Sequence, residues 1–234
     1  MAGGSDAASR VSQITLMSGG FEAMPQIVLE GRRVINNITR AAALFLVKNI
    51  FSLLLSLALL ALPFAYPFAP IQLTLVSALT IGVPSFFLAM EPNYERVQGR
   101  FLPTVMRKAL PGGLTNIFVV LMAQLFMVVF NLALDQVSAV CAAILSVVGL
   151  LVLYQTCKPF GKIRKIIWWT MAAGLLVCFT FFKGFFELHL EDHSSSLIMV
   201  VLLIMTPTVF FAVQRVFDWG DQLTGFVKRK LKRR

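Results

Sequence analysis

Long runs of apolar residues, rather than alternating or one-sided patterns, dominate the chain. A helix needs about 20 predominantly apolar residues to cross the hydrocarbon core of a bilayer, so each such run predicts a membrane-spanning helix. The runs occupy residues 42–62, 70–90, 114–134, 136–154, 166–186 and 196–214. We therefore predict an all-α polytopic membrane protein, built as a bundle of six transmembrane helices.

Composition supports this prediction. Hydrophobic residues make up 58% of the 234 positions and charged residues only 14%, which lies outside the range of an ordinary soluble domain. The cysteines are Cys141, Cys157 and Cys178. They are too few and too scattered for a disulfide framework or a zinc site, and we interpret them as packing residues.

The distribution of basic residues predicts the orientation of the bundle. Of the 21 lysines and arginines, all except Lys48 and Lys183 lie before the first span, between spans two and three, between spans four and five, or after the last span. Cytoplasmic loops are the ones enriched in Lys and Arg. We therefore predict a multi-pass protein of the plasma membrane with both termini in the cytoplasm.

The same distribution explains the net charge of +10 without a nucleic-acid partner. We divide the chain into a cytosolic segment at 1–40, a transmembrane domain at 41–214 and a basic cytosolic tail at 215–234. A basic run beside a membrane span is attracted to anionic headgroups. We therefore expect membrane lipid as the partner of the tail.

Polar side chains at membrane depth are the candidates for chemistry, because each is costly there without a partner or a role. In the first span Lys48, Asn49 and Ser52 lie within about one helical turn. An intramembrane lysine of this kind suggests an ion path. The alternative is that Lys48 extends to the interface, where its charge is hydrated.

The second span carries Ser77 and Thr80 just before Gly82 and Pro84. Since Pro84 has no amide hydrogen, the carbonyl of Thr80 is predicted to lose its helical donor. A free carbonyl beside hydroxyl groups is a suitable set of cation ligands. A proline kink without any ligand is the alternative, because such kinks are common in membrane helices.

Other polar positions within the spans are given structural roles. Asn116, Gln124 and Asn131 are interpreted as interhelical hydrogen-bonding groups, and Thr206-Pro207-Thr208 as a structural kink.

Motifs in the first 93 residues identify a family. They are Gly4-Ser5-Asp6-Ala7-Ala8, a strand-like ITLM, the stretch FEAMPQIVLEGRRVINNI, and the elements at Pro70–Leu73 and Gly82–Pro84. Together they resemble the C-terminal portion of bacterial P-type cation-transporting ATPases, nearest the calcium-pump-like group. There the end of a phosphorylation domain continues through a stalk into the fifth transmembrane helix. The resemblance implies that the six spans correspond to the last six of the family.

The resemblance also implies an ion site. Asn49 and Thr80 fall on the family's ion-site asparagine and threonine, and Ser77 falls where calcium pumps carry an asparagine. Ser52 and Ile81 stand where those pumps carry a glutamate and an aspartate, so two acidic ligands are absent.

The roles expected from the resemblance are therefore as follows. Asn49, Ser52, Ser77 and Thr80 bind the ion, and Gly82 and Pro84 unwind the helix. Lys48 resembles the internal lysine of the gastric proton–potassium pump and acts as a counter-charge.

No catalytic residue is expected within this chain. The sequence lacks the DKTG stretch of the phosphorylated aspartate and a nucleotide-binding domain, which the family needs to use ATP and Mg. The first hypothesis is the cation-translocating part of such an ATPase, acting with a missing N-terminal portion. The alternative is a free-standing six-helix channel or accessory subunit without ATP coupling.

Overall fold

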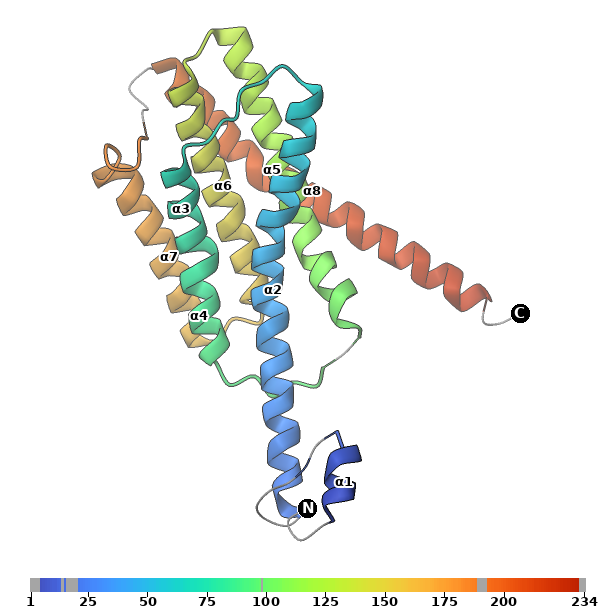
Figure 1. Cartoon of the computed structure of the whole chain (residues 1–234). Helices are drawn as coiled ribbons and strands as arrows, with labels where there is room; N and C mark the ends of the chain where they lie inside the picture. The colour runs from blue at the N-terminus through green and yellow to red at the C-terminus, as the bar shows by residue number, and fades with distance from the viewer. Residues whose placement is uncertain (1–4, 14, 16–20, 98, 189–192, 232–234) are drawn as a thin grey trace.

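The computed structural model describes residues 5–13, 15, 21–97, 99–188 and 193–231, with the backbone alone for 127, 193–194 and 221–231. This part of the chain contains helices and no strands, which confirms the predicted all-α class. The elements are α1 (Asp6–Val11), η1 (Phe21–Ala23), α2 (Met24–Ala61), α3 (Pro70–Ser77), η2 (Ala78–Gly82), α4 (Val83–Met90), α5 (Phe101–Phe130), α6 (Leu134–Thr156), α7 (Lys162–Phe181) and α8 (His193–Leu231), shown in Figure 1.

Six helices in the described ranges are long and apolar enough to cross a membrane, as the apolar runs predict. The helix ends differ from the predicted span ends. The third helix begins at Phe101 rather than at 114, because the helix continues beyond its apolar part. The apolar runs 114–134 and 136–154 leave Asp135 alone between them and so predict it as the link, but in the structure the link is formed by residues 131–133. Asp135 lies in the first turn of α6, where a carboxylate is favoured by the helix dipole.

The predicted stalk and first span form a single rod. Helix α2 has 38 residues, about 57 Å at 1.5 Å per residue, and Figure 1 shows it extending from the bundle to the small α1. Pro25 stands in its first turn, where no intrahelical N–H bond is lost. The strand-like ITLM lies outside the described residues apart from Thr15, and so do the side chains of the basic tail from residue 221 onward.

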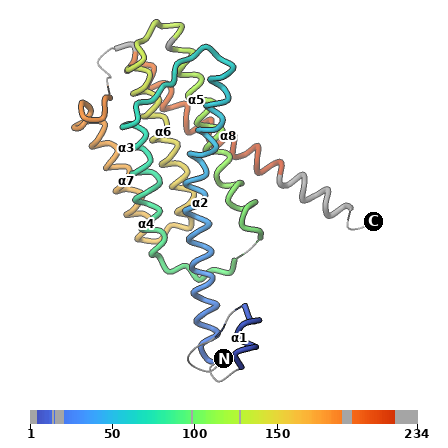
Figure 2. Tube along the Cα trace, in the orientation of Figure 1, coloured from blue at the N-terminus to red at the C-terminus, as the bar shows by residue number. Residues whose placement is uncertain are grey.

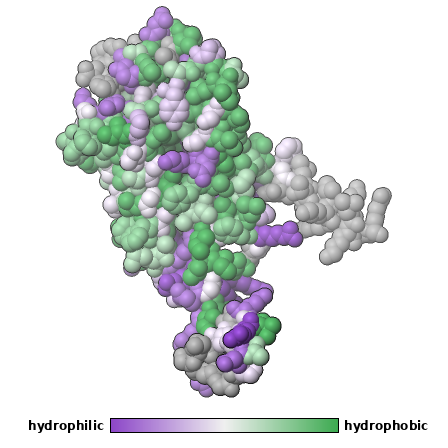
Figure 3. All heavy atoms as spheres, viewed as in Figure 1, coloured by the Kyte–Doolittle hydropathy of each residue, from purple (hydrophilic) through white to green (hydrophobic). Residues whose placement is uncertain are grey.

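Helix α6 occupies the centre of the bundle. In its most apolar stretch 72% of residues are buried, against 17–41% in the other spans. Helices α2, α3, α5, α7 and α8 all pack against it, as Figure 2 allows the reader to follow. On the face seen in Figure 3 the surface of the bundle is largely apolar, and hydrophilic residues gather where α2 leaves the bundle, at the opposite end, and in a small patch between the two ends. Such a large apolar surface is expected against lipid rather than water.

The segment 70–90 continues as a helix through its predicted break. Residues Ala78–Gly82 form a π-helical turn, in which the amide of Val83 donates to the carbonyl of Ala78. A π turn widens the backbone locally and is often found at functional sites. Pro84 follows in the first turn of α4. The helix is therefore irregular at the predicted position, with helical backbone on both sides.

Candidate ion-binding site

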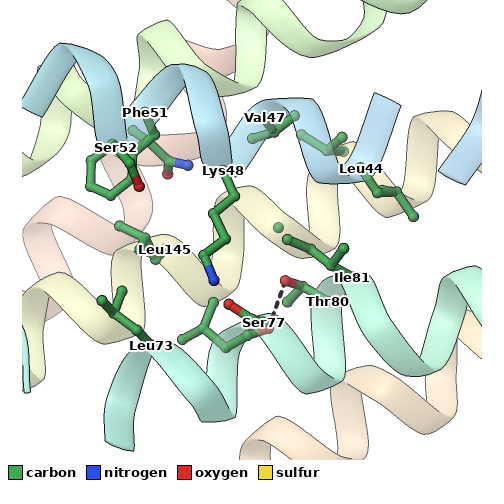
Figure 4. A pocket seen from close by; sticks show the side chains of 14 residues that line it. Leu44, Val47, Lys48, Phe51, Ser52, Leu73, Ser77, Thr80, Ile81 and Leu145 are labelled. Carbon is green, nitrogen blue, oxygen red and sulfur yellow. Dashed lines mark hydrogen bonds between the residues drawn. The ribbon is translucent and has the colours of Figure 1, made fainter. Parts of the chain in front are cut away.

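A cavity of about 40 Å³ lies between α2, the α3–η2 segment, α5 and α6. Since a water molecule needs about 10–15 Å³ of such space, the cavity can hold an ion or a few waters. Most of its wall is apolar. The polar residues that line it are Lys48, Ser52, Ser77, Thr80 and Asn116, and Figure 4 shows the Lys48 side chain reaching from α2 toward Ser77 and Thr80.

The structure brings together most of the predicted site residues. Lys48, Ser52, Ser77 and Thr80 line the cavity, whereas Asn49 does not and is exposed on α2. Gly82 is the last residue of η2 and also lies outside the cavity wall. The ion-binding role of Asn49 and the unwinding role of Gly82 stay predictions.

Thr80 is the most enclosed hydroxyl of the site, with 2% of its surface exposed. Its Oγ1 donates to the Val76 carbonyl at 2.7 Å. A hydroxyl has one proton and two acceptor lone pairs. Because the proton is used within the helix, the lone pairs of Thr80 remain available for a cation.

Gly149 fixes the position of Thr80 from the opposite wall. A Cβ atom at Gly149 would stand 2.7 Å from both Cβ and Cγ2 of Thr80, closer than real Cβ contacts. Only glycine therefore allows α6 to approach the π turn this closely. The sequence contains no motif that marks Gly149, because the contact joins residues far apart in the chain.

Asn116 also lines the cavity, although its sequence position predicted an interhelical hydrogen-bonding role. It lies on α5 with 4% exposure, and its Oδ1 has no hydrogen-bond partner in the described part of the chain. Buried carbonyl oxygens are normally paired, and an unpaired one is costly. The only sequence signal was a polar residue at membrane depth, which could not separate a helix contact from a ligand.

The charge within the cavity comes from Lys48, and none of the lining residues is a carboxylate. Hard divalent ions such as Ca²⁺ prefer several carboxylate oxygens. The neutral donors of this cavity can solvate a cation but cannot balance a double charge.

A second polar cluster lies at the C-terminal end of α4, the helix that follows the π turn. Glu91 caps α4, and its carboxylate accepts from Arg164 Nε at 2.8 and 2.7 Å and from Arg40 at 3.2 Å. Both arginines are buried, Arg40 at 5% exposure and Arg164 at 7%. We call these three side chains the Glu91 clamp. It joins α2, α4 and α7, and the sequence did not indicate it.

Two asparagines of α2 add backbone contacts to the clamp. Asn37 Nδ2 donates to the carbonyls of Ala89 and Glu91, and Asn36 Nδ2 donates to those of Asn93 and Glu95. These residues belong to the INN part of the predicted stalk motif. The end of α4 is therefore held to the stalk by hydrogen bonds and by charge.

The fold and the cavity together define a polytopic helical membrane protein with a polar site between its first two spans. Its known relatives are transport ATPases. The chain is 33% identical over 178 residues to the "Probable cation-transporting ATPase exp7" of Streptococcus pneumoniae, covering 72% of this chain and 23% of that protein. It is 44% identical over 124 residues to the "Calcium-transporting ATPase CtpE" of Mycobacterium bovis, covering 49% and 16%.

A "Calcium-transporting ATPase" of Bacillus subtilis is 30% identical over 88 residues, covering 38% of this chain and 10% of that protein. No protein-family model and no solved structure matches the chain. The chain is thus a homologue of the P-type cation-transporting ATPases, and it spans less than a quarter of the length of these relatives. These matches confirm the predicted family. The small share of each relative that is covered is consistent with the prediction that the chain corresponds to the C-terminal portion of such an ATPase.

Proposed function

We propose that the chain forms the cation pathway of an ATP-driven pump, and that the ion passes between α2 and the α3–η2–α4 segment. The convergence of Ser52, Ser77, Thr80 and Asn116 on one intramembrane cavity is the observation that supports this most strongly. Polar oxygens are retained at membrane depth where they serve a ligand or a partner, and the Asn116 oxygen has no partner among the described residues.

Part of the ion's coordination comes from outside this chain. Asn49 and Lys48 are exposed on the face of α2 that also exposes Phe45. In a complete pump, helices of the N-terminal portion cover this face and turn Asn49 from a surface residue into a lining residue. The same helices supply carboxylates if the ion is divalent, because the donors in this chain are neutral.

Lys48 acts as a movable counter-charge in this proposal. Its ammonium group lies at the cavity on a long flexible side chain. When the cation leaves, the ammonium can take its place among the oxygens, and when the cation enters, repulsion moves the lysine away.

The stalk connects the site to the ATP-using portion. A rigid helix such as α2 transmits displacement along its length, and the Glu91 clamp links it to α4 and α7. ATP and Mg would act in the portion outside this chain, and movement there would reach the cavity through α2. The proposal keeps the predicted division of the chain into a cytosolic segment at 1–40, a transmembrane domain at 41–214 and a basic cytosolic tail at 215–234. The protein then lies in the plasma membrane with both termini in the cytoplasm.

A chimera tests the proposal. This chain replaces the matching segment of the Mycobacterium bovis relative, and cation uptake into inverted membrane vesicles is measured with and without ATP. ATP-dependent uptake supports the pump. Uptake that proceeds equally without ATP would instead support the free-standing channel. If the chimera inserts into the membrane normally but shows no uptake, both the pump and the channel would be contradicted.

A further inference from the structure

A second cavity, of about 170 Å³, lies where α2 leaves the bundle. It is separate from the ion cavity, and the two share no lining residue. Its walls come from α2, from the connection between α4 and α5, from the first turns of α5, and from Lys158 in the connection between α6 and α7. Residues distant in the sequence therefore meet at one point near the predicted membrane interface.

The side chains that meet there are mainly basic. Arg40, Arg100, Lys108 and Lys158 line the cavity, and Glu95 is the only carboxylate among the described residues of its wall. Arg40 is buried and bonds to Glu91, which lies outside the cavity. Like charges gathered in a partly enclosed space repel each other, so the cavity favours a negatively charged occupant.

Three of these four basic side chains have no carboxylate within ion-pair distance among the described residues. They are Arg100, Lys108 and Lys158, and the Lys158 ammonium lies 4.8 Å from the centroid of the Tyr154 ring. Phe101, the first residue of the 30-residue helix α5, also lines the cavity. The N-terminus of a helix carries partial positive charge and unpaired amide groups, which adds to the field of the side chains.

We propose that this cavity binds a phosphate group, either that of an anionic phospholipid headgroup or that of a soluble phosphate compound. Lysine and arginine side chains beside a helix N-terminus are the donors that recognise phosphate. Basic pockets between membrane helices on the cytoplasmic side bind lipid headgroups in this way. Bound phosphate would tie the start of α5 to α2 and Lys158, close to the Glu91 clamp.

The test uses the full chain in neutral detergent micelles that contain equal amounts of phosphatidylglycerol and phosphatidylcholine with the same acyl chains. Lipids retained by the protein are counted by native mass spectrometry. The test variant is Lys108→Met with Lys158→Met. The matched control is Lys162→Met with Lys165→Met, which removes the same charge from two exposed lysines outside the cavity. Thermal unfolding of both variants checks that the fold is kept.

The wild-type chain should retain one phosphatidylglycerol in preference to phosphatidylcholine, and the test variant should lose about tenfold in retention, as expected for lost charge-assisted hydrogen bonds. The control should bind as wild type does. Inorganic phosphate and ATP are then added as competitors: displacement assigns a soluble phosphate ligand, and persistence assigns the headgroup. The site would be overturned if both variants lost phosphatidylglycerol retention equally. It would also be overturned if the wild-type chain showed no preference for phosphatidylglycerol over phosphatidylcholine and bound no phosphate.

Discussion

Gly149 on α6 and Thr80 on the π turn are in contact at a distance that only a glycine permits. A Cβ at Gly149 would stand 2.7 Å from Thr80 Cβ and 2.8 Å from its Oγ1. Since the Thr80 side chain is already held by its bond to Val76, it cannot turn away without losing that bond. The packing of α6 thus sets the direction of the Thr80 lone pairs.

Gly149→Ala should therefore disturb both packing and site. Overpacking of this kind costs about 1–3 kcal/mol, measured as the free energy of unfolding in mixed micelles. Gly174→Ala is the control, because its Cβ would meet Leu79 at an ordinary 3.7 Å. It should be neutral or stabilising by about 0.5–1 kcal/mol. Similar stabilities for the two variants would show that Thr80 and α6 are loosely packed.

The Glu91 clamp should contribute strongly to stability. Its side chains are 7–12% exposed, and removing one partner of a buried ion pair costs about 3–5 kcal/mol because the other charge is left unpaired. Glu91→Gln should show a loss of this size. Asp218→Asn breaks the exposed Arg107–Asp218 pair and should cost less than about 1 kcal/mol. Equal losses would contradict a buried clamp.

Cys157 reports on the same region. It is fully buried beside the clamp, and burial raises the pKa of its thiol to about 11, although Arg164 and Arg40 act in the opposite direction. The thiol is therefore protonated at pH 7–9 and becomes reactive only as the pH nears that value, because the thiolate is the reacting form.

In a chain with Cys141→Ser and Cys178→Ser, maleimide should label Cys157 slowly at pH 7.5 and faster once Glu91→Gln opens the clamp. Glu30→Gln, which alters an exposed pair with Arg33, is the control and should leave the rate unchanged. Rapid labelling of the parent chain at pH 7.5 would be inconsistent with a closed clamp.

Replacing Asn116 should change cation uptake without changing the stability of the protein. Because its Oδ1 is already unpaired among the described residues, Asn116→Leu removes an unsatisfied group and should change the free energy of unfolding by less than about 1 kcal/mol. In the chimera it should still lower cation uptake. Gln124→Leu is the contrast: the Gln124 Oε1 is also unpaired among the described residues, but its Nε2 donates to the Ala65 carbonyl, away from the cavity. It should reduce stability and leave the ion dependence intact.

Apolar run length predicted the six helices, because the bilayer requirement acts on each span separately. The contacts between spans could be predicted much less well from the sequence. Ser77 and Thr80 could be found as polar residues beside a proline. Gly149 and Arg164 could not, since their significance depends on which distant residue they face. Glu91 shows the same limit, because its two arginines come from helices on either side of it in the sequence.

The direct test of the ion pathway is ATP-dependent cation uptake by the chimera with Thr80→Val, compared with Thr74→Val. Both threonines donate to the carbonyl four residues earlier, at 2.7 and 2.9 Å, but Thr80 lines the cavity and Thr74 is exposed. A ligand bond to a charged group contributes about 1.5–3 kcal/mol, so Thr80→Val should raise the cation concentration for half-maximal uptake roughly ten- to hundredfold, while Thr74→Val should not change it. The same concentration in both variants would contradict a cation pathway at Thr80.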